Sequence, residues 1–154
     1  MVDVRKLDVH PDNPRQGDIG AIVVSIEENG WYGTLVAQRS TNRVLAGNHR
    51  LQAAIAADIK EVPVYWVDVD DAQAKKILLA DNRTSDLASY DDFQLLEILQ
   101  NLVAEDHGLI GTGFDNEDLD NLLKDLDNDG PSQFQQFGTD LETDHTCPKC
   151  GYEF

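Results

Sequence analysis

A β-hairpin that leads through a glycine into a helix constrains this chain more than any other feature. Thr34–Arg39 is β-prone, Ser40-Thr41-Asn42 has the composition of a turn, and Arg43–Ala46 is typical of a returning strand. Gly47 follows directly, and Leu51–Ala57 has strong helix propensity. A chain that passes from strand to helix across one glycine is typical of α/β domains.

The flanking segments continue the alternation of strands and helices. Val2–Leu7 alternates apolar and polar residues and predicts a short strand, and Glu61–Val69 predicts another around Pro63. Helices are expected over 18–29, 70–82, 90–103 and 114–126. Asp18 is the expected N-cap of the first, Asp70 and Asp71 are expected to cap the second, and Gly30 lies just past a C-terminus. The fold class predicted is therefore α/β (α+β), a small mixed sheet with surrounding helices, followed by an acidic, helical and partly disordered tail.

Charge divides the chain unevenly. Residues 1–103 carry 10 Lys/Arg and 16 Asp/Glu, whereas residues 104–154 carry 2 and 13, which together give the net charge of −17. We expect a domain over 1–103, an acidic helical extension over 104–127, a linker over 128–144 and a cysteine-containing tail over 145–154. Such a tail lacks the clustered cations that sequence-independent DNA binding requires, and it suits a basic partner better.

The expected location is the cytoplasm of a bacterial or phage-infected cell. Charged residues follow Met1 almost at once, and no apolar run approaches the roughly 20 residues of a membrane span. The two cysteines do not form a disulfide framework.

The turn Gly47-Asn48-His49-Arg50 is the best candidate site. A helix N-terminus presents free N–H groups and a partial positive charge, which suits phosphate. His49 and Arg50 add side-chain donors, and arginine can bind a phosphate through two nitrogens. An ordinary helix cap with solvated side chains would show the same local pattern.

The order of motifs resembles the ParB/sulfiredoxin superfamily, whose N-terminal domain is also called the ParB-like nuclease domain. The resemblance covers about residues 2–100. The motifs are Asp12-Asn13-Pro14-Arg15, a helix ending in Asn29-Gly30, the hairpin, Gly47-Asn48-His49-Arg50, Glu61-Val62-Pro63-Val64 and Asp81-Asn82.

The resemblance implies a nucleotide site. In ParB proteins the turn that corresponds to Gly47, Asn48, His49 and Arg50 binds the triphosphate of CTP, so these residues are expected to bind a nucleoside triphosphate, CTP or ATP. A later Glu-Asn pair holds Mg²⁺ in that family, and Asp81 and Asn82 resemble it. Arg15 would approach the nucleotide from the N-terminal loop. The alternatives are a helix C-terminal turn for Asp81-Asn82 and a solvated arginine for Arg15.

Three departures from the family limit what it implies. Asn48 stands where sulfiredoxins have a nucleophilic cysteine, so sulfinic-acid chemistry is not expected. Gly30-Trp31-Tyr32-Gly33-Thr34 replaces the Gly-x-x-Gln-Pro stretch of ParB, which leaves the base open. No helix-turn-helix pattern follows, so direct DNA binding is expected to be weak or to depend on a partner.

Cys147 and Cys150 form a CxxC motif followed by Gly151. This spacing is typical of one knuckle of a zinc ribbon, but structural zinc needs four ligands. His145 is a candidate third ligand, and two chains that pool four cysteines are another solution, with a homodimer as the consequence. A metal-free tail and a redox pair are the alternatives. His10 and His107 have no ligand-like neighbours and are expected at the surface.

Three functions fit these observations. The first is a nucleotide-binding module, with slow CTPase or ATPase activity that serves as a switch for DNA-processing partners. The second is an enzyme, a ParB-like nuclease or a phosphotransferase of the kinase type, with candidate carboxylates at Asp68, Asp70, Asp71 and Asp81. The third is an adaptor that uses the acidic tail and the zinc knuckle. Stand-alone domains of this kind resemble those of phages, and no catalytic residue is assigned.

Overall fold

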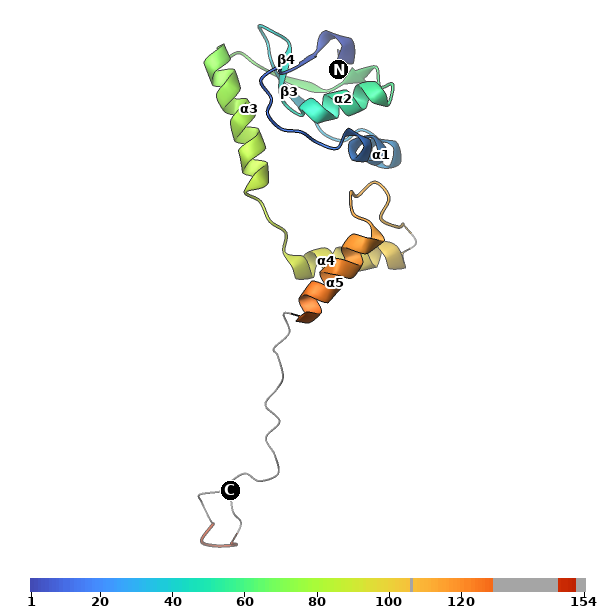
Figure 1. Ribbon diagram of the computed structural model, residues 1–154, viewed down its shortest axis with the longest axis vertical. Helices are drawn as coiled ribbons and strands as arrows, with labels where there is room; N and C mark the ends of the chain where they lie inside the picture. The colour runs from blue at the N-terminus through green and yellow to red at the C-terminus, as the bar shows by residue number, and fades with distance from the viewer. Residues whose placement is uncertain (106, 129–146, 152–154) are drawn as a thin grey trace.

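The computed structural model describes residues 1–105, 107–128 and 147–151. Its helices and strands follow the predicted order closely (Figure 1). They are β1 (Val2–Asp3), the 3₁₀ helix η1 (Val4–Lys6), β2 (Asp8–Val9), α1 (Ile19–Asn29), β3 (Leu35–Gln38), β4 (Arg43–Ala46), α2 (Asn48–Ala56), β5 (Glu61–Val62), β6 (Val64–Val67), α3 (Asp71–Asp86), α4 (Asp92–Ala104) and α5 (Asn116–Asn128).

The main sheet has the strand order β2-β4-β3-β6. Strands β3 and β4 form the predicted antiparallel hairpin, and β2 and β6 pair in parallel on its two sides. Strands β1 and β5 form a separate antiparallel pair. The mixed α/β architecture expected from the sequence is confirmed.

Two predicted strands were too long. The strand over Val2–Leu7 ends after Asp3, whose carboxylate accepts a hydrogen bond from the backbone N–H of Arg5 (2.9 Å) and turns the chain into η1. The strand over Glu61–Val69 is divided at Pro63, which has no N–H to donate to a neighbouring strand. The chain changes sheets there, while the Pro63 carbonyl still accepts from the Leu35 N–H (3.0 Å).

The core lies between the hairpin and helix α2. Leu35, Ala37 and Val44 are fully buried on one face of the sheet, and Leu51 and Ala54 of α2 pack against them. Helix α3 contacts β4 and buries Ala74 and Leu78. It begins at Asp70, the expected capping residue, which accepts from the Gln73 N–H (2.7 Å), and it continues one turn beyond the predicted end at Asn82.

The N-terminal loop is attached to α2 through a buried histidine. His10 is only 5% exposed, so the expectation that it lies at the surface was wrong, whereas His107 is exposed as expected. The backbone N–H of His10 donates to Asn48 Oδ1 (2.7 Å), and the ring Nδ1 accepts from the Asp12 N–H (3.1 Å). The hydrogen bond to Asn48 therefore holds His10 against α2, a long-range contact that no sequence pattern indicated.

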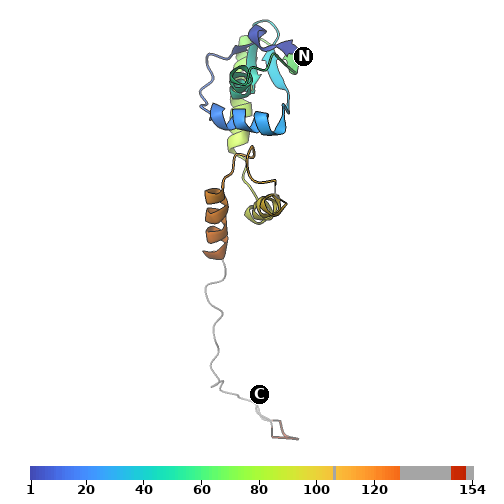
Figure 2. The same ribbon diagram turned by 90° about the vertical axis from the view of Figure 1, so that its right-hand side faces the viewer.

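Helices α4 and α5 pack on each other below the sheet (Figures 1 and 2). The segment between them returns to the first helix, where Asn29 Nδ2 donates to the Gly111 carbonyl (3.1 Å). The boundary between the 1–103 domain and the 104–127 extension stays a prediction, and the linker over 128–144 lies almost wholly outside the described residues. None of the described helices has the length and hydrophobicity needed to cross a membrane.

A matched pair of leucines on α3 tests this packing. Leu78 is 1% exposed and its neighbour Leu79 is 53% exposed. We expect Leu78→Ala to lower the free energy of unfolding by about 2–5 kcal/mol, because it leaves a cavity against the sheet. Leu79→Ala should change it by less than about 1 kcal/mol, since alanine is at least as good a helix former as leucine. Urea denaturation measures both, and equal losses would contradict the packing of α3.

The buried His10 gives stability a dependence on pH. Burial is the main cause that lowers the pKa of its imidazole below the ordinary 6.5; Asp12 opposes this, and Arg43 and Lys75 support it. As the pH falls, the His10 imidazole binds a proton in the unfolded chain before it does so in the folded chain. The contribution of neutral His10 to folding stability is therefore complete above pH 6.5 and is lost as the pH falls through the folded-state pKa. The slope from this one group is at most about 1.4 kcal/mol per pH unit.

Urea unfolding between about pH 5 and pH 8 measures that slope. His10→Asn should flatten it, because Asn retains an acceptor but does not titrate. His107→Asn removes an exposed histidine as the control and should leave the slope unchanged. An identical slope in the wild type and His10→Asn would show that His10 is not the titrating group.

Candidate functional site

A cleft of about 700 Å³ opens where β4 ends and α2 begins. Its walls come from the N-terminal loop, α1, the β3–β4 hairpin, the start of α2 and the second half of α3. Every residue proposed from the sequence for nucleotide or magnesium binding lines it, namely Arg15, Gly47, Asn48, His49, Arg50, Asp81 and Asn82.

Gly47 makes the strand-to-helix connection possible. It has φ +91° and ψ 28°, a left-handed conformation that L side chains rarely adopt. A Cβ at this position would lie 2.6 Å from Cδ2 of the fully buried Leu35. Helix α2 therefore begins within one residue of β4, and its N-terminus opens toward the cleft.

The first turn of α2 offers backbone donors rather than a cap. Gly47 has no side chain to cap the helix, and the first intrahelical bond runs from the Leu51 N–H to the Gly47 carbonyl (2.9 Å). The N–H groups of the three preceding residues have no partner within the helix. They and the helix dipole favour an anion at this end of the cleft.

Asn48 and His49 use their side chains to hold the N-terminal loop. Asn48 is buried and its Oδ1 accepts from the His10 N–H. The His49 Nε2 lies 3.1 Å from the Arg15 carbonyl oxygen, within hydrogen-bond distance. Gly17 approaches the other side of the ring so closely that a Cβ would lie 2.8 Å from His49 Nδ1.

Arg50 is the arginine of the Gly47–Arg50 turn. Among the described residues, no carboxylate forms an ion pair with it. Its side chain is half-buried beside Gly33, where φ is +113° and an added Cβ would lie 3.1 Å from Arg50 Nη1. Arginine in a cleft without an acidic neighbour has its donors available for an anion.

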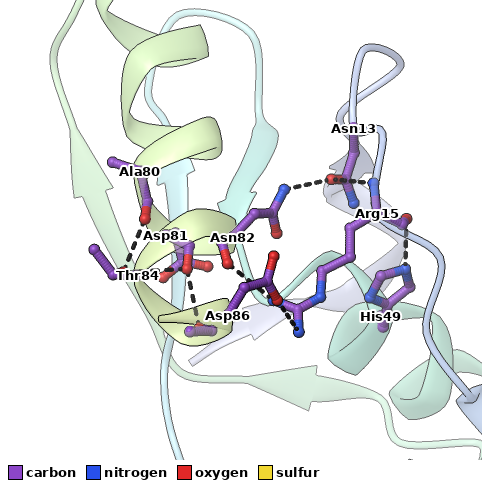
Figure 3. A network of polar contacts seen from close by, with 9 residues as sticks. Asn13, Arg15, His49, Ala80, Asp81, Asn82, Thr84 and Asp86 are labelled. Carbon is purple, nitrogen blue, oxygen red and sulfur yellow. Dashed lines mark hydrogen bonds and ion pairs between the residues drawn. The ribbon is translucent and has the colours of Figure 1, made fainter. Parts of the chain in front are cut away.

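Arg15 connects the N-terminal loop to α3 (Figure 3). Its guanidinium binds the Asn82 carbonyl (3.2 Å) and the Asp86 carboxylate (3.0 Å). Asn82 Nδ2 in turn donates to Asn13 Oδ1 (2.9 Å). The structure thus brings Arg15 beside Asp81 and Asn82, with part of its charge offset by Asp86.

Asp81 and Asn82 have oxygen atoms available for a cation. Asp81 is exposed, and its carboxylate forms no hydrogen bond or ion pair with any residue in the described ranges. The Asn82 side chain donates to Asn13 through Nδ2, so its Oδ1 takes no part in that hydrogen bond. Carboxylate and amide oxygens suit Mg²⁺ that also carries phosphate.

Several cleft residues were not identified from the sequence. Ser25 Oγ and the Tyr32 hydroxyl lie 2.7 Å apart, and Ser85 belongs to the turn of α3 beyond its predicted end. Thr112 and Gly113 come from the segment between α4 and α5. A cluster of glycines around residue 111 was the available signal, but it did not indicate where that segment lies.

The other candidate carboxylates do not gather with Asp81. Asp70 caps α3, and Asp71 accepts from Gln38 Nε2 (3.0 Å). They stand about ten residues before Asp81, roughly 15 Å along the helix. The part of the chain that is described holds no group of three or more His, Cys, Asp or Glu side chains suited to a metal.

Comparison with known proteins identifies the domain. Residues 1–83 match the model of the ParB N-terminal domain, which is more than half of the chain. A probable chromosome-partitioning protein ParB of Borreliella burgdorferi is 27% identical over 88 residues, which are 53% of this chain and 34% of the relative. A probable plasmid-partitioning protein ParB of Thermus thermophilus is 34% identical over 94 residues, 59% of this chain and 31% of the relative.

A solved structure agrees with the fold. It is the C-terminally truncated chromosome-partitioning protein ParB of Caulobacter crescentus complexed with CTP-γ-S, with a TM-score of 0.59, 22% identity, and coverage of 69% of this chain and 63% of that one. The chain spans about a third of the length of the curated relatives that it matches. Since the family model covers the sheet, the cleft turn and most of α3, the chain belongs to the ParB N-terminal domain family.

Proposed function

We propose that the cleft binds a nucleoside triphosphate together with Mg²⁺. The observation that carries the proposal is the meeting, at one end of the cleft, of the uncapped α2 N-terminus and the Arg50 guanidinium, which has no carboxylate partner in the described part of the chain. Both favour a multiply charged anion. A protein of net charge −17 repels a free triphosphate, so local cations and N–H donors are needed to overcome that repulsion.

The residues of the turn have different parts in this site. The backbone N–H groups of Asn48 to Arg50 and the Arg50 guanidinium face the phosphates. The side chains of Asn48 and His49 hold the N-terminal loop, and with it Arg15, against the cleft. Arg15 fixes the distance between this loop and α3 through Asp86 and Asn82.

The donors on α3 fit Mg²⁺. Asp81 and Asn82 would hold the ion through oxygen atoms, and when bound it would neutralise phosphate charge and orient the triphosphate. Without Mg²⁺, the Asp81 carboxylate faces the same cleft as the phosphates and repels them. This arrangement makes nucleotide binding dependent on the metal.

CTP is the first nucleotide to test, because the Caulobacter crescentus ParB of similar fold is complexed with CTP-γ-S. The likeness to partitioning proteins supports a nucleotide-dependent switch that acts with DNA-processing partners. In this proposal, slow hydrolysis of the nucleotide returns the switch to its nucleotide-free state. We place the nuclease and phosphotransferase alternatives behind this one, because Asp70 and Asp71 lie far from Asp81 along α3.

Arg50→Ala should weaken nucleotide binding roughly ten- to a hundredfold, since a charge-assisted contact contributes about 1.5–3 kcal/mol. Arg39→Ala is the matched control: it removes the same charge from a residue that lies over Trp66 and does not line the cleft. Calorimetry with CTP, ATP, GTP and UTP in the presence of Mg²⁺ gives the affinities. Equal losses of affinity in both variants would show that only the net charge of the protein matters. No binding by the wild type at millimolar concentration would refute the proposal.

Asp81→Asn should weaken binding in Mg²⁺ but not in a chelator, where the loss of a negative charge leaves affinity equal or slightly higher. Asp92→Asn, an exposed carboxylate in the first turn of α4, should leave both conditions unchanged. The same calorimetric titrations, run with and without Mg²⁺, separate the two effects. If Asp81→Asn lowers affinity equally under both conditions, Asp81 contributes to the cleft without holding the ion.

A further inference from the structure

The segment Cys147–Gly151 forms a tight turn around two thiols. Pro148, Lys149 and Cys150 make the turn, and the Gly151 N–H donates to the Cys147 carbonyl (2.9 Å). Gly151 has φ +72°, which lets the backbone leave the turn in a left-handed conformation. Both cysteines are free thiols; Cys147 is half-buried and Cys150 is exposed.

The turn holds two thiols three residues apart, the spacing of a metal knuckle. The thiolate is the form of cysteine that binds metals. Two such sulfurs on one turn make half of a tetrahedral thiolate site.

A redox pair fits this geometry less well. Reactive CxxC pairs of the thioredoxin type lie beside a βαβ unit, where a helix N-terminus lowers the thiol pKa. Within the described residues 147–151 the CxxC motif forms a turn that ends at a left-handed glycine, and none of the five is helical.

The number of cysteines decides how such a site is completed. Structural zinc takes four ligands, usually with several thiolates among them. The 154 residues contain two cysteines, and in the described ranges no group of three or more His, Cys, Asp or Glu side chains surrounds a metal position. His145, the third ligand considered from the sequence, lies outside the described residues.

We propose that Cys147 and Cys150 bind zinc and that a second copy of this chain supplies the other two thiolates. Four thiolates around Zn²⁺ leave two negative charges at the site. One Lys149 ammonium from each copy lies in the same turn, is exposed and offsets them. The chain is thereby joined to its copy through the tail, independently of whether the cleft binds nucleotide.

Metal titration of the 154-residue chain tests the proposal. Reduced protein, stripped of metal, is titrated with Co²⁺ as a spectroscopic stand-in for zinc and then with Zn²⁺. We expect the visible bands of tetrahedral tetrathiolate cobalt, saturation at one ion per two chains, and displacement of cobalt by zinc. Light scattering should show a dimer that a chelator dissociates.

The variants distinguish the ligands from the rest of the turn. Cys147→Ser and Cys150→Ser should each abolish the thiolate bands and the chelator-sensitive dimer. Lys149→Ala, in the same turn but with no sulfur, should retain one ion per two chains. Circular dichroism of the cysteine variants should match the wild type, since the turn lies outside the core.

Two outcomes would overturn the proposal. Saturation at one ion per chain, with the protein remaining a monomer, would place all ligands within one copy. Absence of cobalt bands in fully reduced protein would show that the turn does not bind this class of metal. Neither result depends on nucleotide affinity, so the two proposals stand or fall separately.

Discussion

The left-handed conformation of Gly47 is the constraint on which the cleft depends. Strand β4 must end and α2 must begin within one residue, because Leu35 of the neighbouring strand fills the space on one side of the connection. Any side chain at this position would meet both an unfavourable φ and a buried leucine. The same glycine leaves α2 without a side-chain cap, so one constraint sets the course of the chain and leaves the helix N–H groups available.

A second layer of contacts holds the N-terminal loop against the start of α2. Asn48 and His49 follow the glycine directly, yet their side chains bind the N-terminal loop rather than project into open space. The hydrogen bond to the Asn48 Oδ1 offsets the cost of burying that oxygen. The loop then carries Arg15 to α3, where Asp86 and Asn82 receive it. The cleft is thus built from segments that lie as far apart in the sequence as Asn13 and Gly113.

The charge distribution explains why the cations of the cleft matter. Most of the negative charge lies on the exposed surface and in the acidic second part of the chain. Arg15 is partly neutralised by Asp86, whereas Arg50 has no such neighbour in the described structure. The Arg50 guanidinium and the helix dipole therefore both add positive potential at the first turn of α2.

Local patterns were sufficient to predict most of the elements. The hairpin, its turn and the capping residues Asp18 and Asp70 follow from alternation, turn chemistry and side-chain oxygens at helix starts, all of which act within a few residues. The glycine turn was recognisable from its adjacent residues, whereas the Asp81-Asn82 pair was proposed only through the resemblance to the ParB/sulfiredoxin superfamily. The sequence could not show that the chain would change sheets at Pro63, because strand partners decide this.

The tertiary structure alone decided how the site is assembled. No periodic apolar pattern around His10 predicts its burial, and it is buried where Asn48, 38 residues later, accepts its backbone N–H. Ser25, Tyr32 and Thr112 line the cleft only because α1 and the segment after α4 fold back beside α2. The sequence determined which residues offer phosphate and metal chemistry, since that depends on their side chains and nearest neighbours. Long-range packing determined which of them remain free to use it, because each hydrogen bond within the fold removes a donor or an acceptor from the cleft.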